Sequence, residues 1–180
     1  MSTEREQHRD ALLSHFLEHT AQEDPALYER LIKVDEEGMR NLAGVLGRFD
    51  GASRAALEAT SRLQACRILS RLHQPSTDSL ATTNRILDYL DLNANSKLEE
   101  SEIDLVVEVF ELFARAESQN DTLSLRELQM LYASLRKLDR NSDLRLDAQE
   151  RVELRRGLDD PQAFLANEKA NNPWYRELLT

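Results

Sequence analysis

The sequence reads DLNANSKLEESE at residues 91–102 and DRNSDLRLDAQE at residues 139–150, and this repeated pattern is its most informative feature. The two stretches begin 48 positions apart and carry oxygen-bearing side chains at the same relative positions, namely 1, 3, 5, 9 and 12. One such stretch would be a weak signal, because Asp, Asn and Glu are common in any solvated turn. Two copies in the same register indicate a repeated structural unit.

Apolar residues at helical spacing flank both stretches. Those around the first stretch are Ile86, Leu87 and Leu90 before it, and Ile103, Val106, Val107 and Phe110 after it. Those that lead into the second are Leu131, Leu135 and Leu138. The pattern therefore predicts loops between helices whose apolar faces pack together.

Both stretches resemble the calcium-binding loop of the EF-hand superfamily. In that loop a hard cation takes side-chain oxygens from positions 1, 3 and 5, a backbone carbonyl from 7, a group often acting through water from 9, and a two-oxygen carboxylate from 12. The resemblance implies two sets of Ca²⁺ ligands: Asp91, Asn93, Asn95, the Lys97 carbonyl, Glu99 and Glu102, and then Asp139, Asn141, Asp143, the Arg145 carbonyl, Asp147 and Glu150. Position 8 is Leu98 or Leu146, an apolar residue suited to a short strand that joins the two loops.

Both loops depart from the EF-hand pattern at position 6, where glycine allows a sharp turn with positive φ. Ser96 and Leu144 occupy this position, and a branched apolar residue in a left-handed conformation costs on the order of 1 kcal/mol or more. The second loop, however, has four carboxylates among its ligands and the first has three, and more charge raises affinity. These effects oppose each other, so the sequence does not rank the two sites.

The resemblance covers residues 79–158 and implies a calcium-binding protein without catalytic activity. Glu102 and Glu150 would draw the exit helix of each hand toward the ion and change the exposure of the apolar faces. Calcium sensors with many targets use Met-rich grooves, but only Met130 lies in this region. We therefore expect a sensor or a calcium-stabilised interaction module that has a dedicated partner, an internal target or a structural role.

Composition predicts an all-α chain. The 180 residues include only five glycines and four prolines, 41% are hydrophobic, and long stretches are rich in Leu, Ala, Arg and Glu. We expect a helical bundle over residues 1–75, an EF-hand pair over 79–158 and a helical tail over 159–180. The boundary between the first two falls at the HQPSTD segment, residues 73–78. Asp24 and Asp160 each precede a proline and are predicted N-caps.

Charge and hydropathy limit the partners. The net charge of −10, without a basic stripe, disfavours nucleic acid and anionic membranes. No run approaches 18 apolar residues, so we expect no membrane span. The amino-terminal residues do not resemble a secretory signal and Cys66 has no partner for an internal disulfide, so we expect a cytoplasmic protein.

The connection between the two loops is 36 residues long, and residues 116–127 resemble a degenerate third loop with Leu123 at position 8 and Glu127 at position 12. Ala116 stands where the first carboxylate would be, so no ion is expected there. Ser124 and Glu127 also fit a capping box at the start of a helix, which is the favoured interpretation.

The last residues gather Trp174, Tyr175, Leu178 and Leu179 at an otherwise polar terminus. In one interpretation they complete the core. In the other, residues 172–180 pack against the EF-hand pair as a built-in target helix and limit access to its groove.

Two alternatives come from other classes of protein. The chain could be a helical scaffold whose EF-hand-like loops bind no ion. It could also be a zinc-dependent enzyme, because His15, Glu18 and His19 read H-x-x-E-H on one helical face. The sequence supplies no recognisable third zinc ligand, so a non-enzyme is the favoured prediction.

Overall fold

The computed structural model describes residues 4–49, 59–91, 98, 100–117 and 121–179. These residues form an all-α structure with no strand, and one isolated parallel bridge joins Leu72 and Leu123. None of the described helices is both long and apolar enough to cross a membrane. The helices are α1 (Glu4–Glu23), α2 (Pro25–Leu31), α3 (Glu36–Phe49), α4 (Ala59–Leu69), α5 (Thr77–Leu90), α6 (Glu100–Glu117), α7 (Leu125–Leu138), α8 (Ala148–Asp159), α9 (Pro161–Asn171) and α10 (Pro173–Leu179).

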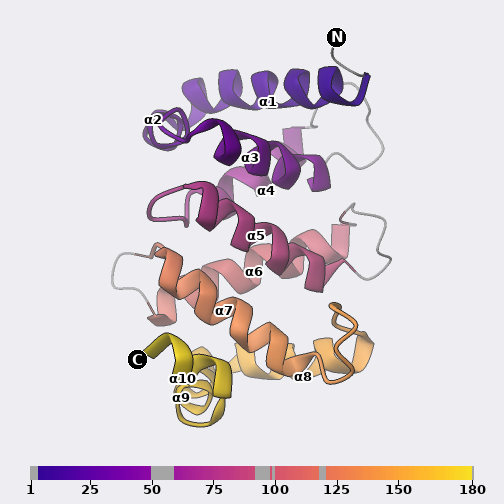
Figure 1. The fold of residues 1–180 in the computed structure, drawn as a ribbon, viewed down its shortest axis with the longest axis vertical. Helices are drawn as coiled ribbons and strands as arrows, with labels where there is room; N and C mark the ends of the chain where they lie inside the picture. The colour runs from indigo at the N-terminus through magenta and orange to yellow at the C-terminus, as the bar shows by residue number, and fades with distance from the viewer. Residues whose placement is uncertain (1–3, 50–58, 92–97, 99, 118–120, 180) are drawn as a thin grey trace.

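The helices form two stacked layers (Figure 1). In one layer α1, α3, α5 and α7 follow one another, each packed against the next, and α10 packs on α7. In the second layer α4 packs against α6, and α9 contacts both α6 and α8. From α3 to α8, consecutive helices therefore alternate between the two layers.

Local side-chain chemistry explains where several helices begin. Asp24 and Asp160 are N-caps of α2 and α9, each followed by proline, as the sequence predicts. Ser124 and Glu127 form the predicted capping box of α7, in which each side chain accepts a hydrogen bond from the other residue's backbone N–H. The favoured interpretation of residues 116–127 as a cap is thus confirmed for the helix start.

The hydrophobic core is continuous along the stack. Leu42 and Leu46 of α3, Leu80 and Leu87 of α5, and Leu131 of α7 belong to one cluster of buried residues. This cluster extends across the HQPSTD segment, and α3 and α5 pack directly on each other. The expected bundle and the expected pair of loops thus share their apolar interior.

Backbone hydrogen bonds tie each loop to the preceding unit. The Leu98 N–H donates to the Arg48 carbonyl near the end of α3, and the Leu146 N–H donates to the Tyr89 carbonyl near the end of α5, both at 2.8 Å. These donors are therefore not used in the short strand that was expected to join Leu98 to Leu146. The reason is that successive helix–loop–helix units stack in the same orientation. Position 8 of each loop therefore lies beside the end of the first helix of the preceding unit.

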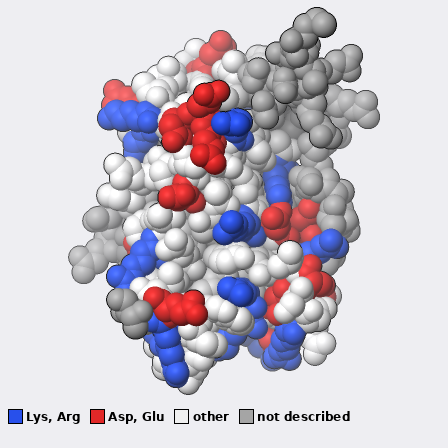
Figure 2. Space-filling model, in the orientation of Figure 1, with Lys and Arg blue, Asp and Glu red and all other residues white. Residues whose placement is uncertain are grey.

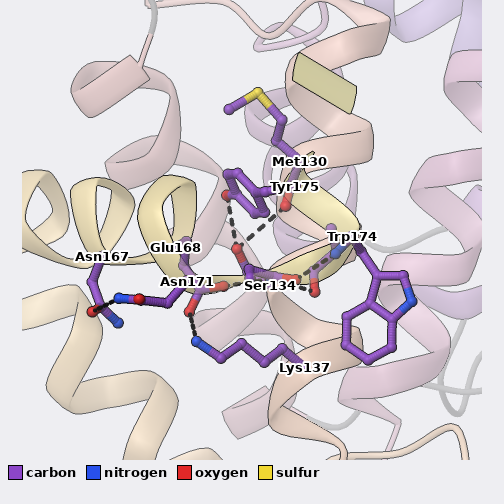
Figure 3. A network of polar contacts seen from close by, with 10 residues as sticks. Met130, Ser134, Lys137, Asn167, Glu168, Asn171, Trp174 and Tyr175 are labelled. Carbon is purple, nitrogen blue, oxygen red and sulfur yellow. Dashed lines mark hydrogen bonds and ion pairs between the residues drawn. The ribbon is translucent and has the colours of Figure 1, made fainter. Parts of the chain in front are cut away.

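The carboxyl-terminal helices attach to α7 through a buried polar network (Figure 3). Tyr175 is fully buried and its hydroxyl bonds the Ser134 hydroxyl at 2.8 Å. Asn172, also fully buried, donates to the Ala133 carbonyl at 3.1 Å. Buried Glu168 lies 3.3 Å from the Lys137 amine. The tail thus packs against α7, and Tyr175 completes the core.

Gly157 does not end its helix, although glycine often follows the last residue of a helix. α8 continues to Asp159 before the next cap begins. A Cβ atom at residue 157 would lie 2.5 Å from Cδ2 of Phe164, so glycine lets α9 approach α8 closely.

Candidate metal centre

The second loop folds around the carboxylate of Asp139, the residue that follows α7. This side chain is buried and accepts hydrogen bonds from the N–H groups of Leu144 at 2.9 Å and Asp143 at 3.3 Å. Asp143 in turn accepts from the Arg145 N–H at 3.0 Å. The loop backbone therefore wraps around carboxylates and orients their oxygens.

Leu144 adopts the left-handed conformation that the sequence resemblance predicts for position 6, with φ of 68°. Ser142, two residues earlier, has φ of 56°. Leu144 is 63% exposed, so burial of its side chain does not offset the conformational cost. Closing the loop around Asp139 compensates for this strain, because the left-handed turn directs the Leu144 N–H at the carboxylate.

The entry into α8 combines a helix cap with the end of the loop. Asp147 is the N-cap, its side chain accepts the Glu150 N–H, and Glu150 Oε1 accepts the Asp147 N–H at 3.0 Å. Glu150 Oε2 accepts the Arg140 N–H at 2.7 Å. This box escaped the sequence analysis, although the D-x-x-E spacing of residues 147 and 150 was a usable signal.

Three of the predicted ligands of the second loop come together. One carboxylate oxygen from each of Asp139, Asp143 and Glu150 lies within 4.8 Å of the others. Asp147 is exposed and is not part of this cluster. Asn141, also exposed, lies next to Asp143 and donates to its carboxylate at 3.4 Å. The cluster offers hard oxygen ligands of the kind that Ca²⁺ and Mg²⁺ prefer.

Burial and hydrogen bonding shift the pKa values of Asp139 and Asp143 in opposite directions. Burial raises the pKa of the Asp139 carboxyl, and the neighbouring Asp143 adds to the rise. The pKa of Asp143 is lowered, chiefly because its carboxylate accepts the Arg145 N–H. The pair thus concentrates negative charge in a partly desolvated position, where a cation would be favoured.

The ends of the first loop are also built from buried acids. Asp91, the C-cap of α5, and Glu102 in α6 are 4% and 2% exposed. The other ligands predicted for this loop, Asn93, Asn95, Lys97 and Glu99, and Ser96 at position 6, lie outside the described residues.

Arg151 is a functional candidate that the sequence analysis did not identify. Its guanidinium, from α8, contacts both loops: the Leu146 carbonyl of the second and the Leu90 carbonyl and Glu102 carboxylate at the ends of the first. An arginine directly after position 12 carries no recognisable sequence signal, because its role depends on how the two units stack.

The H-x-x-E-H segment lies on α1, where His15 and Glu18 are exposed and His19 is half-buried. Within the described part of the chain, the only compact group of three His, Cys, Asp or Glu residues is the one at Asp139, Asp143 and Glu150. The described side chains thus bring no third zinc ligand to His15 and His19.

Acidic and basic side chains are interspersed over the face of the molecule in Figure 2, and the described Lys and Arg residues form no continuous stripe there.

Comparisons with known proteins supply no further assignment. No protein-family model matches the sequence, no curated protein matches it, and no solved structure matches its fold.

Proposed function

We propose that this chain is a calcium-binding helical protein that binds Ca²⁺ at the second loop and, with the buried Asp91 and Glu102, at the first. The units α5–α6 and α7–α8 serve as the two EF-hand-like units. The observation that carries the proposal is the convergence of Asp139, Asp143 and Glu150 oxygens within 4.8 Å. A left-handed backbone at Leu144, the position where EF-hand loops need it, supports the same assignment.

Within this proposal calcium acts mainly as a structural stabiliser. The apolar residues that a calcium sensor would expose are buried in the core, among them Leu90, Phe110 and Leu135. The face of α7 near Ser134 is covered by Tyr175 of the tail. An ion that neutralises crowded carboxylates would therefore stabilise the closed stack, and a dedicated partner would bind its outer surface.

The proposal is tested by titrating the intact chain with Ca²⁺ in a calorimeter and by melting it with and without the ion. We expect one or two ions per chain. The melting temperature should rise with free Ca²⁺, because a ligand that binds only the folded state stabilises it. Identical melting curves in millimolar Ca²⁺ and in chelator would instead favour the helical scaffold.

Substitution of Glu150→Gln assigns the site. The amide keeps the side-chain shape but loses the charge and one hard oxygen ligand, so binding in the second loop should weaken at least tenfold. Asp159→Asn is the matched control, since it removes one negative charge from the same helix, away from the cluster. Glu102→Gln makes the same test for the first loop. A titration unchanged by either substitution contradicts the assignment of that loop.

A further inference from the structure

We propose that a cavity beside the HQPSTD segment binds a small organic phosphate monoester, with Arg30 and Lys33 as the cations that hold the phosphate group. The cavity lies between the end of α2 and the loop that leads into α5, at one edge of the stack (Figure 1). Its volume of about 450 Å³ is within the range of pockets that hold small organic ligands. None of the residues of the candidate metal centre lines it.

Two segments of the chain supply the described lining residues. Arg30, Lys33, Val34 and Asp35 come from the end of α2 and the turn that follows it, and residues 73–77 come from the loop before α5 and its first residue. Two of these side chains are cationic, and Asp35 is the only acid among the described lining residues. The lining therefore carries a net positive charge in a chain whose net charge is −10.

The Arg30 guanidinium is anchored at the cavity. Its Nη1 donates to the carbonyl of Leu72, the residue directly before the lining segment 73–77. A guanidinium has five N–H donors, and this bond uses one of them. An arginine that is already positioned suits phosphate, because its planar fork binds two phosphate oxygens through parallel hydrogen bonds.

Lys33 supplies the second positive charge. Its side chain is exposed, and within the described part of the chain no hydrogen bond or ion pair engages its amine. The ammonium can therefore turn toward an anion in the cavity without breaking an existing contact. A phosphate monoester carries up to two negative charges at neutral pH, which the charges of Arg30 and Lys33 match.

Asp35 opposes these cations but is itself engaged in the cavity wall. Its Oδ1 accepts the Thr77 hydroxyl and, at 2.7 Å, the Gly38 N–H, and these bonds hold the pKa of the Asp35 carboxyl below its usual range. A Cβ atom at residue 38 would lie 2.1 Å from Cγ1 of Val34 and 3.3 Å from the Thr77 nitrogen, so glycine permits this close approach. The two segments are thus fastened together, which fixes the cavity before a ligand enters.

Apolar lining favours an organic monoester over free phosphate. Val34 is half-buried and Pro75 is buried, and both line the cavity. An alkyl or aryl group attached to the phosphate would lose water against these side chains.

The test titrates the intact chain with phenyl phosphate, inorganic phosphate and phenol in calcium-free buffer and follows backbone amides by ¹H–¹⁵N NMR. We expect phenyl phosphate to shift amides within residues 33–35 and 73–77 and to bind at least about threefold more tightly than inorganic phosphate. Phenol lacks the charge and should leave these amides unshifted at the same concentration.

Charge variants identify the residues that hold the phosphate. Lys33→Gln should weaken phenyl phosphate binding about fivefold. Arg85→Gln is the matched control, because Arg85 is exposed on α5 and does not line the cavity, and it should change binding less than about twofold.

Two further variants separate charge from shape. Asp35→Asn should tighten binding about twofold or more, because the amide oxygen can still accept the Gly38 N–H while the negative charge is lost. Arg30→Lys keeps the charge but loses the planar fork, so it should weaken binding about threefold or more. Melting curves of all variants check that each one is folded.

Equal effects of Lys33→Gln and Arg85→Gln, or amide shifts confined to other parts of the chain, would overturn this site. Equal affinities for phenyl phosphate and inorganic phosphate would overturn the organic class of ligand. Absence of any shift at about 10 mM phenyl phosphate, which would saturate a site of millimolar affinity, would overturn the proposal as a whole. Calcium titrations are separate measurements, so each of these failures leaves the calcium proposal standing.

Discussion

At the scale of single residues, Leu144 combines two costs that a folded chain usually avoids. Its backbone is left-handed and its side chain is largely exposed. The sequence predicted the first cost from the EF-hand resemblance alone. Its compensation became visible only in the structure, where the Leu144 N–H donates to the buried Asp139 carboxylate.

We expect Leu144→Gly to raise the free energy of unfolding by about 1 kcal/mol relative to Leu144→Ala. Glycine removes the left-handed strain, whereas alanine keeps it and removes the exposed side chain just as glycine does. Chemical denaturation in chelator measures the difference. Equal stability of the two variants would mean that the loop has another backbone conformation in solution.

At the scale of helices, α7 joins the tail to the candidate metal centre. Its middle and carboxyl-terminal turns hold Asn172, Tyr175 and Glu168 through polar contacts, and Asp139 directly follows its last residue. The Asn172 amide makes three hydrogen bonds: it donates to the Ala133 carbonyl and the Glu168 carboxylate and accepts the Trp174 N–H.

Asn172→Ala should destabilise the protein by about 2–3 kcal/mol, because it leaves buried hydrogen-bonding groups without partners. Asn171→Ala is the matched control. Asn171 is exposed and bonds only the Asn167 side chain among the contacts described, so its loss should cost less than about 0.5 kcal/mol. Thermal and urea unfolding measure both effects. Similar losses for the two variants would contradict a structural role for the buried network.

Helices and caps followed closely from the sequence because both are local. Proline after aspartate, the Ser124–Glu127 box and the apolar spacing each depend on residues within a few positions of one another. The direction in which units stack is not local. The same ligand pattern fits two loops that pair with each other and two loops that each pack on the preceding unit. Only the hydrogen bonds of Leu98 and Leu146 in the structure distinguish these two arrangements. For the same reason Arg151 and the fit of Gly157 against Phe164 could not be foreseen.

At the scale of the whole molecule, the stack has one continuous core rather than separate apolar interiors. Phe16 of α1, Leu87 of α5 and Tyr175 of α10 are all fully buried members of the same cluster. Inner helices such as α3 and α5 pack between neighbours on two sides, as the inner units of other stacked helical proteins do. Stability gained at one loop can therefore reach the rest of the chain through direct packing.

We expect a single cooperative unfolding transition, with equal calorimetric and van't Hoff enthalpies and coincident curves from circular dichroism and tryptophan fluorescence. Calcium should shift this whole transition to higher temperature. Two transitions, of which only the later one moves with calcium, would instead support the predicted division between residues 1–75 and 79–158.

The packing of Trp174 against α7 gives the protein a natural optical probe. Trp174 is the only tryptophan in the chain, and the Arg136 guanidinium lies 4.6 Å from the centre of its ring. Arg136 lies on α7, three residues before Asp139 in the sequence. Indole emission responds to nearby charge and to solvent, so light emitted by the unlabelled chain reports on the end of α7. Rapid-mixing fluorescence can therefore test for the proposed calcium binding in real time, without an attached dye.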